Sequence, residues 1–269
     1  MDKLIVLAIA GMGGLGLFFA VILAIANQKL KVEEDPKIEG IEKLLPGINC
    51  GACGFLSCHD YAVRLAGQGA PVDSCKPGGE AAQKALAAFL GVEARAGERK
   101  TAVVHCAADS KTRKKKAVYS GMNTCAGAAL VKGADAACDY GCLGFGDCFA
   151  ACPFGAIEMV DGLPRIIAGK CVACGKCVSA CPRRIISLET PDEKKGLVYV
   201  ACNSLDRGPE TRKVCQVGCI ACGICAKMSD NAFIVENNLS KPAYEKIKGL
   251  ENLNDIMLKC PTKVIKENR

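Results

Sequence analysis

Aromatic residues and nucleotide-binding signatures are both scarce in this chain. Trp is absent and aromatic residues make up only 5% of the 269 positions, so a large aromatic core is not expected. The motif G-x-G-x-x-G occurs at Gly11–Gly16, but it lies in an apolar stretch without the strand and βαβ unit that a dinucleotide site needs. It is a chance match, and no other nucleotide or flavin motif is present.

Strong charge of either sign is also missing. The formal net charge is only +7, and one dense basic run covers residues 111–116. This run reads either as a solvated loop or as a patch that steers an acidic redox protein into contact. No aromatic or helical recognition pattern accompanies it, so no nucleic-acid partner is expected.

Charge is absent from the first apolar segment, Leu4–Ala26. A helix rising about 1.5 Å per residue over this length spans a hydrocarbon core of about 30 Å. A signal peptide is the alternative, because Ala24-Ile25-Ala26 resembles a cleavage site, but its apolar part is normally only about 7–15 residues. Lys29 and Lys31 follow, so we expect a single-pass anchor in the cell (inner) membrane with the bulk of the chain in the cytoplasm.

Cysteine is abundant, with 20 residues. The cysteines come in tight runs with two-residue gaps, and Pro follows directly at Cys152, Cys181 and Cys260. Disulfide scaffolds scatter their cysteines, whereas this pattern is typical of iron–sulfur proteins. A reducing compartment follows, because free thiolates must persist until clusters are inserted.

The first run predicts one 4Fe-4S site. Its spacing is Cys50-x2-Cys53-x4-Cys58, and Cys75 follows after a predicted helix. Structural zinc is the alternative, since four cysteines also suit zinc. His59 reads as a surface residue, because four thiolates already complete the site.

The central runs predict a two-cluster ferredoxin, in which the fourth Cys of each run crosses to the other cluster. The similar segments "FGAIEMV" and "RRIISLE" follow the two runs and indicate an internal duplication. The spacing assigns one cluster to Cys138, Cys142, Cys148 and Cys181, and the other to Cys152, Cys171, Cys174 and Cys177.

The C-terminal segment reads as a second, degenerate ferredoxin module. Ser229 and Asp230 stand where its Cys-Pro pair is expected, and counting back from Cys260 places Ile256, Leu253 and Leu250 at the other ligand positions. These losses are mutually consistent with one erased cluster. The retained cluster is assigned to Cys219, Cys222, Cys225 and Cys260.

Four cysteines remain. Cys106 and Cys202 end the similar runs "TAVVHC" and "LVYVAC", which read as strands, and each is followed by a loop and a second Cys. We therefore expect a fifth 4Fe-4S cluster on Cys106, Cys125, Cys202 and Cys215, the alternative being two free or zinc-bound pairs. His105 would then be a donor to the site or an exposed residue.

The expected fold class is α+β, with an N-terminal transmembrane helix followed by small iron–sulfur modules. The expected division is an anchor (1–28), a linker (29–39), a helical 4Fe-4S domain (40–95), a strand-containing segment with Cys106 and Cys125 (96–134), a two-cluster ferredoxin-like domain (135–190) and a C-terminal domain with the degenerate module (191–269).

Together these features resemble the B subunits of the Rnf (Rsx) electron-transport complex. The resemblance covers nearly the whole chain and rests on Leu4–Ala26, "NCGACGFLSC" with Cys75, "VVHC", "CDYGCLGFGDCFAACPFGAI", "KCVACGKCVSACPRRII", and "CQVGCIACGICAK" to "KCPTKVI". The degenerate C-terminal module departs from relatives that carry more ligands there.

The resemblance implies a membrane translocase that couples electron flow from reduced ferredoxin to NAD with Na+ or H+ transport. This subunit would receive ferredoxin's electrons and carry them to flavin-bearing partner subunits, without catalytic residues of its own. The alternatives are an electron-transfer subunit of a membrane hydrogenase or formate dehydrogenase, and a zinc-stapled interaction protein.

Overall fold

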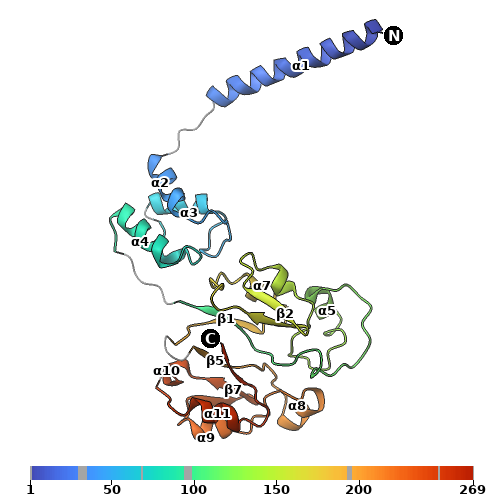
Figure 1. The fold of residues 1–269 in the computed structure, drawn as a ribbon, viewed down its shortest axis with the longest axis vertical. Coiled ribbons are helices and arrows are strands. Elements are labelled where there is room, and N and C mark those ends of the chain that lie inside the picture. The colour runs from blue at the N-terminus through green and yellow to red at the C-terminus, as the bar shows by residue number, and fades with distance from the viewer. Residues whose placement is uncertain are drawn as a thin grey trace.

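The computed structural model describes residues 2–29, 35–67, 69–93, 99–192, 196–247 and 249–268. Helix α1, Asp2–Lys29, projects away from the remainder of the chain (Figure 1). Its stretch Ile5–Lys29 has a mean hydropathy of 2.5 and none of it is buried, so by length and composition it is able to cross a membrane. Residues 30–34 of the expected linker lie outside the described residues.

A helical unit follows, consisting of α2 (Pro36–Leu44), α3 (Cys58–Ala66), the short 3-10 helix η1 (Val72–Ser74) and α4 (Gly79–Leu90). Helix α2 begins inside the segment expected as linker, because Asp35 caps it by accepting a 2.9 Å hydrogen bond from the Lys37 N–H and Pro36 suits its first turn. Ile41, Tyr61 and Leu86 are fully buried between these helices.

The central part of the chain forms a ferredoxin-like module. Strand β1 (Thr101–Val104) pairs antiparallel with β4 (Ile186–Glu189), and β2 (Ile157–Val160) pairs with β3 (Leu163–Ile166). The short helices α6 (Asp147–Ala150) and α7 (Lys176–Ala180) precede β2 and β4, and α5 (Cys125–Leu130) lies in the long segment between β1 and α6.

The C-terminal part repeats this topology. Strand β5 (Leu197–Val200) pairs with β8 (Ile265–Asn268), and β6 (Phe233–Glu236) pairs with β7 (Leu239–Pro242). Its helices are α8 (Gly208–Val214), α9 (Ile224–Met228), α10 (Tyr244–Ile247) and α11 (Leu253–Lys259). The mixed helix and strand content confirms the α+β prediction.

Matching hairpins connect the inner strands of both modules. Asp161-Gly162 joins β2 to β3, and Asn237-Asn238 joins β6 to β7. All four residues have positive φ, which two-residue hairpin turns require and which Asp, Asn and Gly adopt more readily than other residues. The duplication seen in the cysteine runs therefore extends to the turns between them.

Apolar packing occupies the position of the expected erased cluster. Leu253 and the fully buried Ile256 belong to the core of the C-terminal module, together with Phe233. Ser229, also buried, accepts a 3.1 Å hydrogen bond from the Phe233 N–H. At the positions expected for ligands of the erased cluster, the structure has two core residues, Leu253 and Ile256, and a serine that hydrogen-bonds the backbone.

Replacing Ile256 by Ala should destabilise the C-terminal module by about 2–5 kcal/mol, because a fully buried aliphatic side chain leaves a cavity. The measurement is differential scanning calorimetry of the anaerobic protein. Leu258→Ala on the same helix is the matched control, since Leu258 is 75% exposed and its loss should change stability by no more than about 0.5 kcal/mol. Equal shifts for the two variants would contradict a core role for Ile256.

Candidate iron–sulfur centres

The first group of thiols lies in the helical unit. Ser57 caps α3 by accepting a hydrogen bond from the Asp60 N–H, and the Cys58 N–H donates to Asn49 Oδ1 at 2.7 Å, which fixes the loop at the start of α3. Burial raises the pKa of the Cys75 thiol, and the nearby thiolates of the other three cysteines of this run raise it further. The structure therefore brings together Cys50, Cys53, Cys58 and Cys75.

Two further groups each line a single cavity. One consists of Cys152, Cys171, Cys174 and Cys177. The other consists of Cys219, Cys222, Cys225 and Cys260. Backbone and hydroxyl groups face the sulfurs: the Ala102 N–H donates to Cys171 Sγ at 3.4 Å, and Ser240 Oγ lies 3.2 Å from Cys225 Sγ. These groups match the sets expected from spacing.

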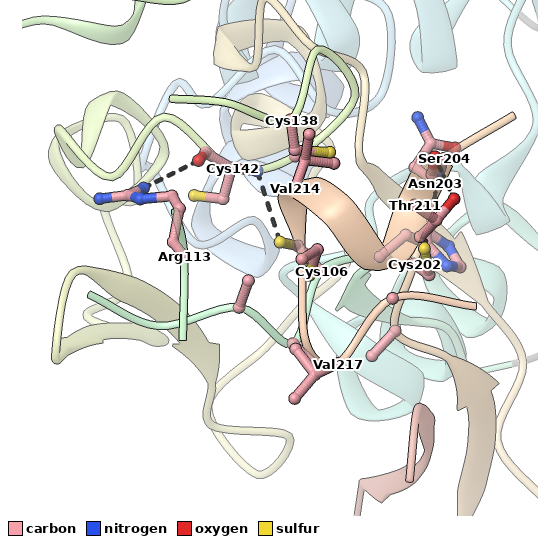
Figure 2. A pocket seen from close by; sticks show the side chains of 17 residues that line it. Cys106, Arg113, Cys138, Cys142, Cys202, Asn203, Ser204, Thr211, Val214 and Val217 are labelled. Carbon is pink, nitrogen blue, oxygen red and sulfur yellow. Dashed lines mark hydrogen bonds between the residues drawn. The ribbon is translucent and has the colours of Figure 1, made fainter. Parts of the chain in front are cut away.

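A fourth group lies between the two ferredoxin-like modules (Figure 2). As expected, Cys106, Cys202 and Cys215 line one cavity, but Cys138 lines it with them. Burial raises the pKa of Cys106, and the thiolates of Cys215 and Cys138 raise it further. Cys142 lines the same cavity and donates its backbone N–H to Cys106 Sγ at 3.4 Å.

Cys125 does not line this cavity within the described residues. The N–H groups of Cys125 and Ala126 donate to the Asp147 carboxylate at 2.8 and 3.0 Å, which holds the start of α5 against α6. Burial raises the pKa of Cys148 to about 11, and the next contributions come from the thiolates of Cys125 and Cys181. Cys125 therefore lies with Cys148, and the expected sets differ from the observed grouping by an exchange of Cys125 and Cys138.

Neither histidine behaves as a ligand. The ring of His105, expected as a donor to the site or as an exposed residue, instead joins the two modules: Nδ1 lies 2.9 Å from the Val200 carbonyl and Nε2 lies 2.8 Å from Ser187 Oγ. His59 lies at the surface and faces the Glu42 carboxylate at 3.2 Å.

The basic run at 111–116 is largely engaged within the chain. Lys111, Lys115 and Lys116 form ion pairs with Asp161, Asp135 and Asp139 at 2.8–3.5 Å. Arg113 turns inward, lines the central cavity and donates from Nη1 to the Cys142 carbonyl at 2.8 Å. This pairing weakens the interpretation of the run as a docking patch.

The chemistry of these groups fits iron–sulfur clusters. All 20 cysteines are free thiols, and among the described residues no three His, Cys, Asp or Glu side chains are arranged to hold a single metal ion. Four-thiol sets with backbone N–H groups pointing at sulfur are the surroundings that 4Fe-4S clusters take. The fold and its thiol groups thus define an iron–sulfur electron-transfer protein.

Comparison with known proteins is consistent with this class. Residues 45–77 match the FeS family model, which describes an Fe-S cluster, and residues 134–182 match the 4Fe-4S dicluster domain. The chain is 39% identical to the B subunit of the Na(+)-translocating ferredoxin:NAD(+) oxidoreductase complex of Acetobacterium woodii, over 94% of this chain and 75% of the relative.

Two other relatives are similar over most of their length. The B subunit of the ion-translocating oxidoreductase complex of Methanosarcina acetivorans is 38% identical over 84% of this chain and 85% of its own. The B subunit of the proton-translocating ferredoxin:NAD(+) oxidoreductase complex of Clostridium ljungdahlii is 38% identical over 94% and 88%. The chain belongs to this family, the B subunits of Rnf-type ion-translocating oxidoreductase complexes.

Replacing His105 by Ala should weaken the contact between the modules by about 0.5–1.5 kcal/mol, because the Val200 carbonyl and the Ser187 hydroxyl lose a partly buried hydrogen-bond partner. The measurements are the apparent melting temperature and the rate at which cluster absorbance is lost on warming. His59→Ala is the control, since its pairing with Glu42 is a partly exposed surface contact within one unit. A His105 variant as stable as this control would show that the bridge contributes nothing.

Proposed function

We propose that this chain is the iron–sulfur electron-transfer subunit of a membrane-bound, ion-translocating ferredoxin:NAD oxidoreductase. It takes electrons from reduced ferredoxin and passes them to flavin-bearing partner subunits. The names of the relatives and the two iron–sulfur domains support this role over a hydrogenase or formate dehydrogenase subunit. The structural observation that carries it is an unbroken succession of thiol groups through the chain.

Twenty cysteines suffice for five 4Fe-4S clusters, each of which passes one electron at a time. Three sets are those described above for the helical unit and the two single cavities. The other eight cysteines form two adjacent groups around Cys142, whose thiol has its pKa raised to about 12, first by burial and then by the thiolates of Cys106, Cys125 and Cys148.

Neighbouring sets touch one another at the C-terminal end of the succession. Burial raises the pKa of Cys202 to about 11, and among the thiolates that of Cys219, in the C-terminal set, raises it most. On the other side, the Cys142 N–H reaches Cys106 Sγ. The group between the modules is therefore flanked by both modules' own groups.

The same adjacency continues toward the membrane anchor. Burial raises the pKa of Cys177, and the thiolates of Cys171, Cys174 and Cys148 raise it further, so the two groups of the central module are neighbours. Burial raises the pKa of Cys174, and the thiolate of Cys50 raises it further. The central module and the helical unit are therefore neighbours at this point. Residues of both parts, including Lys76 and Arg99, line the cleft between them. Figure 1 shows the helical unit between α1 and the modules, so the succession runs toward the anchor.

The C-terminal module is the favoured point of ferredoxin docking. It lies farthest from α1 in Figure 1, and Cys222 is an exposed thiol whereas most of the other cysteines are buried or half-buried. An external donor comes closest to a cluster whose ligand reaches the surface. We place the bulk of the chain on the cytoplasmic side, where reduced ferredoxin and free thiols both persist.

Replacing Cys75 by Ala should interrupt transfer at the helical unit. The clusters of the two modules should still be reduced by ferredoxin, while ferredoxin-dependent NAD reduction by the assembled membrane complex should fall to background. Rapid-mixing absorbance of the purified subunit and NADH formation by membranes measure the two steps.

His59→Ala controls for disturbance of the helical unit and should leave both steps intact. Undiminished NAD reduction in the Cys75 variant would contradict delivery through this set. Loss of ferredoxin oxidation by the isolated variant would instead place the electron acceptor in the helical unit.

Sidedness is testable with membrane vesicles. Trypsin should digest the chain in inverted vesicles, because many Lys and Arg residues follow α1, and should spare it in right-side-out vesicles. Immunodetection of the C-terminal module reads the result. Digestion confined to right-side-out vesicles would reverse the orientation.

A further inference from the structure

We propose that Cys106, Cys138, Cys202 and Cys215 hold a 4Fe-4S cluster that bridges the two ferredoxin-like modules. In the same assignment, Cys125 joins Cys142, Cys148 and Cys181 as the ligands of the central module's own cluster. This inference rests on the proposed iron–sulfur function and concerns which thiols share a site.

The duplication makes the bridging set symmetric. The segments "CDYGC" at 138–142 and "CQVGC" at 215–219 align, so Cys138 corresponds to Cys215 and Cys142 to Cys219. Cys106 follows the end of β1 by two residues, and Cys202 follows the end of β5 by two residues. Each module therefore contributes one equivalent pair of thiols to the cavity between them.

Backbone hydrogen bonds repeat the same symmetry. The Cys142 N–H donates to Cys106 Sγ at 3.4 Å, and the N–H of the equivalent Cys219 points to the Cys202 sulfur. The Ser204 N–H adds a 3.5 Å contact to that sulfur. Such donors stabilise the negative charge that a cluster spreads over its sulfur ligands.

Glycine occupies the equivalent position before the second Cys of each pair. A Cβ at Gly141 would lie 3.4 Å from Cys138 Sγ, and one at Gly218 would lie 3.7 Å from Cys215 Sγ and 2.5 Å from a methyl of Thr211. At both positions a Cβ would make ordinary van der Waals contact with sulfur, so the backbone lies beside the thiols in both modules, and only Gly218 is held to glycine by an overlap, with the Thr211 methyl.

The place of Cys125 follows from a gap in the central run. The C-terminal run is Cys219-x2-Cys222-x2-Cys225, whereas the equivalent central run has Phe145 in the middle position. The backbone N–H groups of residues 145–147 face the Cys125 sulfur, and Asp147 anchors the helix that carries it. Cys125 thus supplies, from the long segment between β1 and α6 (the inserted segment), the ligand that Phe145 does not.

Phe145 itself turns to a different neighbour. Its ring packs edge-on against Tyr119 at 5.7 Å, in the small core that also contains Cys125 and Ala128. The packing of this segment therefore holds Cys125 where it can replace the ligand missing at position 145. The segment is also tied to the bridging cavity, because Arg113 forms a backbone bridge with Cys215.

Iron counting in paired variants tests the assignment. The anaerobically purified full chain should hold about 20 iron atoms, and each single Cys→Ala change should remove about four. Two changes in one site should together remove about four, because the cluster is lost only once. Two changes in different sites should remove about eight.

The proposal expects a loss of about four from Cys138→Ala with Cys202→Ala, and from Cys125→Ala with Cys181→Ala. It expects a loss of about eight from Cys138→Ala with Cys181→Ala. The reverse pattern would overturn it in favour of the spacing-based sets. A wild-type chain without iron would overturn the proposed function as well, so the two failures are distinguishable.

An alanine pair that fails to fold would lose more iron than two clusters hold, and its iron count would not distinguish the assignments. Serine variants keep the test decisive in that case. Serine oxygen can retain a cluster while altering its EPR spectrum. Cys138→Ser and Cys202→Ser should then perturb one signal of the reduced protein, and Cys125→Ser and Cys181→Ser another. Perturbation of a common signal by Cys138→Ser and Cys181→Ser would overturn the assignment.

Discussion

The structure depends on one constraint: the free-energy cost of burying thiolate charge on cysteine sulfur must be offset by groups around the sulfur. Burial, and after it the thiolates of Cys171, Cys174, Cys148 and Cys152, raise the pKa of Cys177 to about 12, whereas a bound cluster takes thiolates. Iron and backbone N–H groups supply that compensation. Each sheet among the described residues has two strands, which is marginal in water without further packing.

The C-terminal module has an apolar core at the positions where the central module has a four-thiol set. Where the central module has Cys152, Cys171, Cys174 and Cys177, the C-terminal module has Ser229, Leu250, Leu253 and Ile256. The strands, hairpin and helices persist because Ile256 and Phe233 fill the space with aliphatic and aromatic volume. The module therefore keeps its fold without thiols at these four positions, and its remaining thiols, Cys219, Cys222, Cys225 and Cys260, line a cavity of their own.

Spacing along the chain predicted much of the architecture because the relevant contacts are local. A Cys-x2-Cys run closes its own loop, so the sets at Cys50–Cys75 and Cys219–Cys225 could be assigned from the sequence, as could the duplicated module and the apolar N-terminal helix. The role of His105 could not, because its partners Val200 and Ser187 lie 95 and 82 residues away. The ion pairs between the basic run and aspartates could not be predicted either, because no pattern in the neighbouring sequence indicates them.

The sequence by itself determined how many thiols the protein carries, their runs, and the equivalence of its two modules. The tertiary structure decided which distant thiols meet: Cys138 with Cys106 in the cavity between modules, and Cys125 with Cys148 beside α6. The physical reason is that Cys106, Cys125 and Cys138 lie on one long segment whose path is set by its packing. Asp147 holding α5 and the docking of the second module fix that path, and neither is encoded in the spacing of cysteines.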